Sequence, residues 1–373
     1  MTRVRGGIGR GVLTRRSLLS LTGAGALAVA GPHLTHAKAA VPSRGINIAG
    51  WFDRKDGIAP TVAVLEKLRH CGFETVRLPI DGDVVLAGAP TLRAIRKGIE
   101  TLLATGFAVL ADLHPADPLY TALRTDALAG GEQVAQAWMA LRAVIADLPA
   151  NRVYPELLNE PPMAPADWLP LRDRLAAILR AACPEHTIVW GPAPDQGIWQ
   201  LPDTPPLDDA RQIAAVHFYA PTAFTHQCQT WGASPLARMH RLPFPATRNM
   251  PAIRESIAAL RAKGDAEAAQ LLETQLATDW TEATIRVQFR QAADWSAATG
   301  CPVMLNEFGV LDFCVDAASR QAWTRAVRRA AEAHGIGWAW WELDQGFGLI
   351  ADRTRNEGFD EAMLGALFED GRK

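Results

Sequence analysis

Short apolar runs alternate with longer amphipathic segments along the chain from residue 45 onward. An apolar run of four to eight residues is typical of a buried strand, and apolar residues spaced three or four apart indicate a helix. The pattern predicts eight strands. They cover residues 45–50, 75–80, 107–114, 153–160, 187–192, 213–219, 302–307 and 337–344.

Amphipathic segments fill most of the intervals between these strands. The segment 59–70 places Val62, Leu65 and Leu68 near helical spacing, and the segment 91–105 ends before Gly106, a residue that favours the C-terminal cap of a helix. Strands joined by such crossover helices run parallel. Further helices are expected at 132–148, 167–182, 253–276, 281–299, 319–334 and 361–368.

Eight strands that alternate with helices predict a parallel sheet, and eight is the number that closes a (β/α)8 TIM barrel. A doubly wound open sheet is the alternative, but it predicts a Gly-rich phosphate loop, and the chain has no GxGxxG or Walker pattern. A long insertion, from 220 to about 279, follows the sixth strand. We therefore expect residues 40–373 to form one catalytic barrel with its chemistry at the carboxyl ends of the strands.

Two strands end in the same dipeptide. Asn159-Glu160 closes the fourth strand, where Pro161 and Pro162 prevent further pairing, and Asn306-Glu307 closes the seventh. A single such pair is usually a solvated loop start. Two carboxylates at the ends of strands that face each other across a barrel mouth instead favour a glycosidase that works with paired acids. A separation of about 5 Å gives retention, and about 6.5–9.5 Å gives inversion.

An ordered set of motifs runs along the chain. It consists of Arg77 in RLPI, His114 in ADLHP, Asn159 and Glu160 in NEP, His217 and Tyr219 in HFY, Glu307 in NEFG and Trp341 in WWE. Each motif is weak alone, but the set in this order is specific. It resembles glycoside hydrolase family 5, the large cellulase family of clan A, and the match runs from about residue 45 to the C-terminus.

The resemblance implies a retaining mechanism with Glu160 as acid/base and Glu307 as nucleophile. In that setting Arg77 can hold the Glu307 carboxylate ionised, Tyr219 can donate a hydrogen bond to it, and Asn159 can bond the 2-hydroxyl of the sugar. Glu156, deeper on its strand, is interpreted as a structural partner of Arg77.

The remaining members of the set carry alternatives. His114 and His217 can bond sugar hydroxyls or position the acids, although a lone histidine at a strand end is often a satisfied core group. Trp341 offers a stacking face for the reacting sugar, or it serves in packing alone. Further aromatic candidates for sugar stacking are Trp51, Trp199 and, in the insertion, Trp231, each of which can equally be a packing residue.

The composition does not by itself indicate which chemistry the protein performs. With 49% hydrophobic and 21% charged residues the chain is ordinary for a globular protein, and its 12 Trp suit sugar stacking or a core equally well. The five cysteines are scattered, with no CxxC or His-rich spacing for zinc, and at most two bridges are possible. We expect neither a metal nor another cofactor.

The first 39 residues have the character of an export signal. Arg15-Arg16 lies in TRRSLL, which resembles the twin-arginine motif, and an apolar run rich in Gly and Ala ends near the small-x-small site 37–39. The run is too short for a stable membrane anchor. Cleavage after Ala39 removes five Arg and one Lys and takes the net charge from −2 to −8. We expect a periplasmic or secreted protein that meets the twin-arginine translocase and does not bind nucleic acid.

The expected substrate is a β-linked polysaccharide or oligosaccharide, with internal cleavage of β-1,4-glucan as the first interpretation. Mannan, xyloglucan, a bacterial exopolysaccharide or exo-acting β-glucosidase activity would need the same site residues. A carbohydrate-binding protein without catalysis is the alternative from another class. Binding alone needs no acid pair, so the presence of Glu160 and Glu307 argues against it.

Overall fold

The computed structural model describes residues 41–369. The predicted signal peptide and its cleavage site lie outside this range, so they remain predictions. No helix within the described range is long and apolar enough to cross a membrane.

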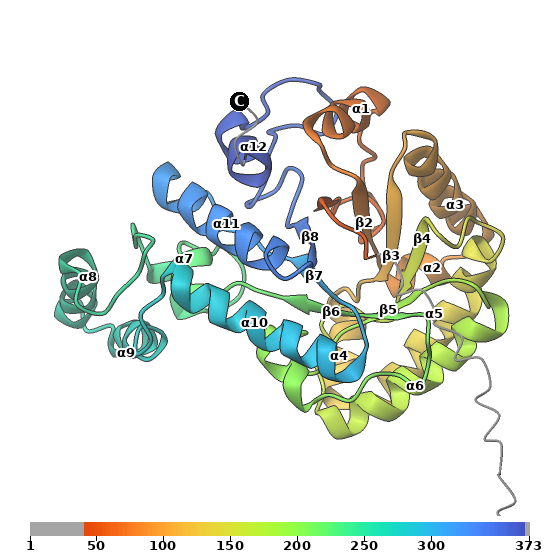
Figure 1. Cartoon of the computed structure of the whole chain (residues 1–373), viewed down its shortest axis with the longest axis horizontal. Helices are drawn as coiled ribbons and strands as arrows, with labels where there is room; N and C mark the ends of the chain where they lie inside the picture. The colour runs from red at the N-terminus through yellow and green to blue at the C-terminus, as the bar shows by residue number, and fades with distance from the viewer. Residues whose placement is uncertain (1–40, 370–373) are drawn as a thin grey trace, which may run out of the picture. The chain divides into compact units, whose positions relative to one another are not determined.

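Eight parallel strands form a closed barrel in sequence order, and β1 pairs with β8 to complete it (Figure 1). This confirms the expected (β/α)8 TIM barrel. The strands are β1 (Gly45–Asn47), β2 (Thr75–Ile80), β3 (Ala108–Leu113), β4 (Val153–Glu156), β5 (Ile188–Trp190), β6 (Gln212–His217), β7 (Val303–Glu307) and β8 (Gly337–Trp340).

Helices surround the strands (Figure 1). The outward side chains of the strands belong to the main hydrophobic core. The helices of the described range are α1 (Val62–Cys71), α2 (Gly82–Leu86), α3 (Ala89–Ala104), α4 (Asp117–Thr125), α5 (Ala127–Ile145), α6 (Pro165–Ala182), the 3₁₀ helix η1 (Ile198–Asp203), α7 (Thr222–Thr225), the 3₁₀ helix η2 (Pro235–Arg238), α8 (Pro251–Ala262), α9 (Ala266–Gln275), α10 (Glu282–Thr299), α11 (Ala317–Glu332) and α12 (Glu361–Phe368).

Side chains alternate along each strand, so every second one points into the barrel. These inward side chains form two layers. One layer is apolar and includes Leu110, Tyr154 and Met304, which belong to a separate buried cluster. Two residues further along the same three strands come Asp112, Glu156 and Asn306, and each of these is fully buried. The strands thus place a polar layer above an apolar plug, toward their carboxyl ends.

The fourth strand is shorter than predicted. β4 ends at Glu156, so Glu160 lies four residues beyond the strand rather than at its end. The connecting backbone still bonds to both neighbouring strands, with Leu157 N donating to Val189 O at 2.9 Å and Asn159 N donating to Leu113 O at 2.9 Å. The Asn-Glu pair is therefore held by backbone bonds outside the regular ladder.

The segment after β6 contains more elements than predicted. The single helix expected at 253–276 is wrong: α8 and α9 are separate, and Gly264 lies between them with a φ of 75°. Asp265 then caps α9 by accepting a hydrogen bond from Ala268 N at 3.1 Å. A glycine in the left-handed region followed by an Asp N-cap ends one helix and begins the next. In Figure 1, α8 and α9 lie at the left, beyond α7.

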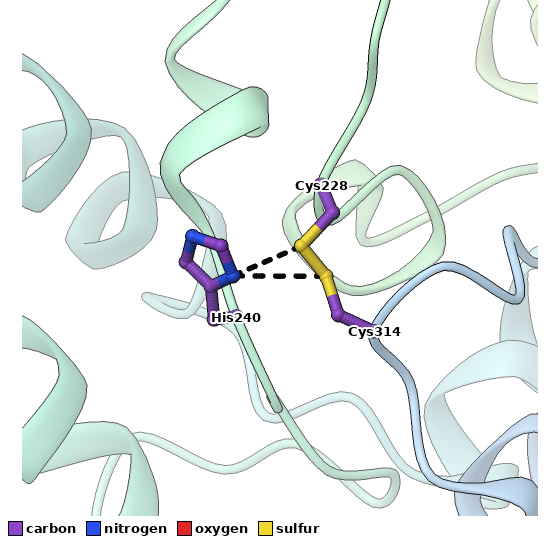
Figure 2. A group of neighbouring side chains, drawn as sticks. All are labelled: Cys228, His240 and Cys314. Carbon is purple, nitrogen blue, oxygen red and sulfur yellow. Dashed lines mark hydrogen bonds between the residues drawn. A yellow bond between two sulfur atoms is a disulfide. The ribbon is translucent and has the colours of Figure 1, made fainter.

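A disulfide connects this insertion to the loop that follows β7. Cys228 and Cys314 are 86 residues apart in sequence with their Cα atoms 6.2 Å apart, and the His240 ring is directed at the bridge (Figure 2). His240 Nδ1 lies 3.0 Å from the Cys228 sulfur and 3.7 Å from the Cys314 sulfur. Cys71, Cys183 and Cys301 are free thiols. One of the two bridges that the sequence allowed is present.

Candidate active site

Arg77 is the centre of the polar layer. Its side chain extends from β2 into the barrel and is fully buried. It forms a bidentate pair with Glu156 at 2.7 and 3.0 Å, lies 3.0 Å from Asp112, and donates to Glu307 at 2.5 Å and to Asn159 Oδ1 at 2.8 Å. Burial lowers the pKa of Arg77, but the three carboxylates outweigh it and raise that pKa well above its usual value. The predicted contact with Glu156 is confirmed.

Two amides that the sequence analysis did not assign to the site complete this layer. Asn47 lies beside Arg77 in the β1–β2 register and accepts from its guanidinium at 3.0 Å, while Asn47 Nδ2 donates to Asn306 O at 2.9 Å. Asn306 Nδ2 in turn donates to Glu156 Oε1 at 2.6 Å. The buried charges therefore have hydrogen-bond partners, as buried ions require.

Glu307 is the last residue of β7, and only 6% of its side chain is exposed. One carboxylate oxygen accepts from Arg77 and the other accepts from the Tyr219 hydroxyl at 2.9 Å, which confirms the predicted contact with Tyr219. Burial and the nearby Glu307 and Glu160 carboxylates raise the pKa of Tyr219 well above its usual value, so its hydroxyl keeps its proton. Two donors aimed at the two oxygens of Glu307 stabilise its negative charge.

Glu160 has a different environment. Its backbone φ is 42°, in the left-handed region, and 36% of its side chain is exposed. Burial of the carboxyl raises the pKa of Glu160; the positive charges of His114 and Arg77 oppose this, and Asp112 adds to it. A carboxyl group with a raised pKa and partial access to solvent is suited to giving and taking a proton.

His217 lies between the two acids. A register irregularity in β6 pairs His217 with Glu307, and its Nδ1 lies 2.9 Å from Glu160 Oε1 and 3.5 Å from Glu307 Oε2. Burial lowers the pKa of His217 to about 4, and the Glu307 charge only partly offsets this, so the ring is neutral at pH 7. Its Nε2 is buried without a hydrogen-bond partner among the described residues. The single ring proton therefore lies on Nδ1, facing the carboxylates.

One oxygen of Glu160, one oxygen of Glu307 and a nitrogen of His217 all lie within 4.8 Å of one another. This spacing would also suit a metal ion. The Glu307 oxygens, however, already accept hydrogen bonds from Arg77 and Tyr219, so each of them has a donor within the protein. The other group with ligand spacing, Cys228, His240 and Cys314, has its two sulfurs bonded to each other, and a metal needs free thiolates.

The family model for cellulase (glycosyl hydrolase family 5) matches residues 34–346. The chain belongs to glycosyl hydrolase family 5. Its curated relative Endoglucanase 3 of Fibrobacter succinogenes is 26% identical over 353 residues, which cover 86% of this chain. The chain spans about half (52%) the length of that relative.

Solved structures share the family 5 barrel. Endoglucanase Cel5A of Thermotoga maritima superposes with a TM-score of 0.71 at 23% identity, covering 89% of this chain and 98% of that one. Cellulose synthase subunit Z of Clostridioides difficile gives a TM-score of 0.70 at 22% identity, covering 88% and 99%. At these identities the likeness establishes the fold.

His114 and Trp341 form one wall beside the family 5 acids. Their rings stack with centroids 5.7 Å apart and planes 12° apart. His114 Nδ1 lies 2.8 Å from Asp112 Oδ2, and its Nε2 lies 3.3 Å from the amide nitrogen of Asn159. Burial lowers the pKa of His114. The hydrogen bond to Asp112 and the negative charge of Asp112 raise it by more, so the net change is an increase. His114 is thus anchored from below, with Trp341 partly exposed against it.

All eight predicted site residues converge in the structure through these contacts. The other tryptophan candidates are more scattered. Trp51 stacks on Phe52 with centroids 4.8 Å apart, whereas Trp199 in η1 is 52% exposed. Trp231 is 47% exposed and packs edge-on against His226 with centroids 6.1 Å apart.

An aromatic group extends from Tyr219 into the insertion. His226 lies 5.0 Å from the Tyr219 ring and 5.4 Å from Phe347, and Trp231 lies 6.3 Å from Phe347, all measured between centroids. Cys228, three residues before Trp231, is the attachment point of the disulfide. The bridge therefore holds the exposed end of this group near Tyr219, the hydrogen-bond partner of Glu307.

Sequence reasoning missed Asn47, Asp112 and Gln196. Asn47 and Asp112 occupy inward positions of strands, where a polar side chain between apolar neighbours is itself a signal of a buried network. Gln196 lies in the loop after β5 and carries no comparable pattern.

Proposed function

We propose that this chain is a retaining glycoside hydrolase that cleaves internal bonds of β-1,4-linked glucan. The observation that carries the proposal is the pair of carboxylates, Glu160 and Glu307. One oxygen of each lies within 4.8 Å of the other, beside a neutral His217. A retaining pair needs about 5–5.5 Å between carboxyl groups, because one acid must reach the anomeric carbon itself. An inverting pair needs a wider gap that admits water.

In the first step Glu307 attacks the anomeric carbon while the glycosidic C–O bond breaks and Glu160 gives its proton to the leaving oxygen. In the second step water gives a proton to Glu160, and its oxygen attacks the same carbon and releases Glu307. The environments match these roles. Arg77 and Tyr219 each donate a hydrogen bond to one oxygen of Glu307, whereas burial raises the pKa of Glu160 and favours its protonated form.

The Nδ1–H group of His217 can keep its hydrogen bond to Glu160 after that acid has lost its own proton. It donates to a Glu160 oxygen at 2.9 Å, so it supports the carboxylate in the second step without itself carrying a positive charge. Asn159 and the stacked rings of His114 and Trp341 lie beside the acids. They offer a bound sugar ring an amide and an aromatic face.

Substrate and mode of attack rest on similarity. The curated relative is named an endoglucanase, which supports internal cleavage of glucan. Digestion of carboxymethylcellulose tests this: we expect viscosity to fall much faster than reducing ends appear. Release of glucose from the start, with viscosity hardly changed, would favour exo action and overturn the endo proposal.

Mannan is the second candidate. The structurally similar Cel5A of Thermotoga maritima has been solved in complex with mannotriose and with cellobiose, so a barrel of this kind accommodates both sugars. A reducing-sugar assay across soluble β-glucans and mannans separates the two. Activity confined to mannan would change the substrate and leave the acid pair in place. Binding without turnover on every polymer would favour a carbohydrate-binding protein.

We also propose export by the twin-arginine route, supported by Arg15-Arg16 and the mildly apolar run that follows. Replacing both arginines with lysine keeps the charge and removes the motif, so precursor should accumulate in the cytoplasm. Normal appearance of mature protein outside the inner membrane would contradict this route.

A further inference from the structure

Gln196 is fully buried beneath the acid pair, in the loop between β5 and η1. Its Oε1 accepts a hydrogen bond from Glu160 N at 3.0 Å, and its Nε2 donates to Glu156 Oε1 at 3.1 Å. One partner is a donor and the other a carboxylate acceptor, so the two bonds fix which end of the amide points at each. The side chain thus connects the backbone of Glu160 to the buried pair of Arg77 and Glu156.

The backbone of Gln196 holds the other member of the acid–histidine contact. Its carbonyl accepts from His217 N at 2.8 Å, and its own N–H donates to Pro192 O at 3.0 Å. A single residue therefore attaches both the Glu160 backbone and the His217 backbone, whose side chains meet at 2.9 Å. Asp195 N donates to Pro161 O at 3.3 Å and connects the same two loops a second time.

Two features indicate that the contacts of Gln196 hold the Glu160 backbone in a particular position. Glu160 has a φ of 42°, a conformation that a residue with a side chain keeps only when its surroundings hold it. The loop also makes room for the Gln196 side chain: a Cβ on Gly191 would lie 2.2 Å from Gln196 Cγ. Any side chain at position 191 would displace Gln196 from its two partners.

We propose that Gln196 is a positioning residue for the acid/base: it holds the Glu160 backbone so that the carboxyl meets both His217 and the glycosidic oxygen. Because Gln196 is fully buried, it acts through Glu160 and not through contact with substrate. This inference rests on the proposed function in assigning Glu160 as the acid.

The test compares Gln196→Met with Gln212→Met on two aryl β-cellobiosides. Methionine keeps the length of the side chain and removes both amide bonds. Gln212 is a matched control, since it too is buried with both amide ends bonded, but it lies at the opposite end of β6 from His217. A phenyl leaving group needs protonation and a 2,4-dinitrophenyl group does not.

We expect Q196M to lower kcat/KM for the phenyl substrate by roughly tenfold to a hundredfold, part of what a general acid contributes, with little change for the dinitrophenyl substrate. The basic limb of the pH profile should shift as well. Q212M should show no difference between leaving groups. Equal losses on both substrates in Q196M, or the same leaving-group dependence in Q212M, would overturn the proposal.

If Q196M does not fold, Gln196→Asn provides the second test, because its amide is one methylene too short to reach both partners and should give the same leaving-group pattern. Glu160→Ala separates the two levels of inference. Leaving-group dependence in E160A but not in the Gln196 variants sinks only the positioning role. Absence of that dependence in E160A sinks the assignment of Glu160 and, with it, the role of Gln196.

Discussion

Asn306-Glu307 and Asn159-Glu160 are the same dipeptide, but the first forms the end of β7 and the second lies beyond the end of β4. Glu307 ends β7 within the ladder, 6% exposed, with a donor on each oxygen. Glu160 lies four residues past β4 in a left-handed conformation, 36% exposed, with a raised pKa. Identical side chains thus differ in exposure, backbone conformation and hydrogen-bond partners because of their position relative to the strand end.

The preceding asparagines differ in the same way. Asn306 points into the barrel and supports Glu156, whereas Asn159 accepts from Arg77 at the barrel mouth and meets His114. The seventh strand therefore contributes one structural amide and one acid, whereas the segment after β4 contributes an amide and an acid that lie beyond the strand end. Four predictions test this contrast.

The largest effect is expected for Glu307→Gln. The amide oxygen can still accept from Arg77 and the amide nitrogen can donate to the Tyr219 hydroxyl oxygen, so the protein should fold, but a neutral amide cannot attack the anomeric carbon. We expect kcat to fall by about 10⁴-fold or more, as for loss of other covalent nucleophiles. Steady-state rates on carboxymethylcellulose measure this, with circular dichroism as the folding control. Activity within tenfold of wild type would remove the nucleophile assignment.

Glu160→Ala should have a smaller and substrate-dependent effect. Loss of a general acid costs about 10²–10⁴-fold, and only where the leaving group needs a proton. Azide, which needs no general base to attack, should restore turnover on a 2,4-dinitrophenyl glycoside and give a glycosyl azide that chromatography detects. Failure of azide to restore any turnover would give Glu160 a different role.

The two asparagines should separate activity from stability. Asn159→Ala is expected to lower kcat/KM by roughly 10²-fold, since hydrogen bonds to the 2-hydroxyl contribute several kcal/mol in the transition state. Asn306→Ala removes a donor to the buried Glu156 and should lower the free energy of unfolding by about 1–3 kcal/mol. Urea titration and kinetics on both variants measure the split. A similar pattern in the two variants would show that the contrast between the asparagines is wrong.

The smallest effect is a shift in pH dependence. In the proposed mechanism Glu160 is protonated in the first step, so we expect kcat/KM to fall as pH rises through its pKa. Burial raises that pKa, so the basic limb should lie above the range of an ordinary glutamic acid. In E160A, assayed on the dinitrophenyl substrate, this limb should disappear. A basic limb that persists unchanged in E160A would belong to another group.

Many strands and helices of the barrel could be predicted because each corresponds to a local run of apolar or amphipathic residues. The range 75–80 for β2 and 361–368 for α12 agree with the structure, and both are uniform apolar or amphipathic runs. The acids could be found because strand ends carry the chemistry of this fold, whereas Arg77, inside β2, is indicated by the family resemblance. The break between α8 and α9 is also local, since Gly264-Asp265 is a helix stop and start signal, and the predicted single helix overlooked it.

Other features depend on contacts that no local pattern records. Gln196 belongs to the site only because the loop after β5 folds under Glu160, and the Cys228–Cys314 bridge depends on where an insertion and a distant loop meet. β4 also ends before its predicted end, while Leu157 and Asn159 still bond to the neighbouring strands. Such features follow from tertiary structure, which a periodicity does not contain.

The position of Arg77 among Asp112, Glu156 and Glu307 limits the order in which this site could change over evolutionary time. Removing one partner of a buried ion pair costs about 3–5 kcal/mol, a large part of a domain's stability. Glu307 and Glu156 are direct partners of Arg77, whereas the Glu160 carboxylate contacts His217 at the edge of the network. A lineage that abandoned hydrolysis and kept the barrel would therefore lose Glu160 first and retain the arginine with its buried carboxylates.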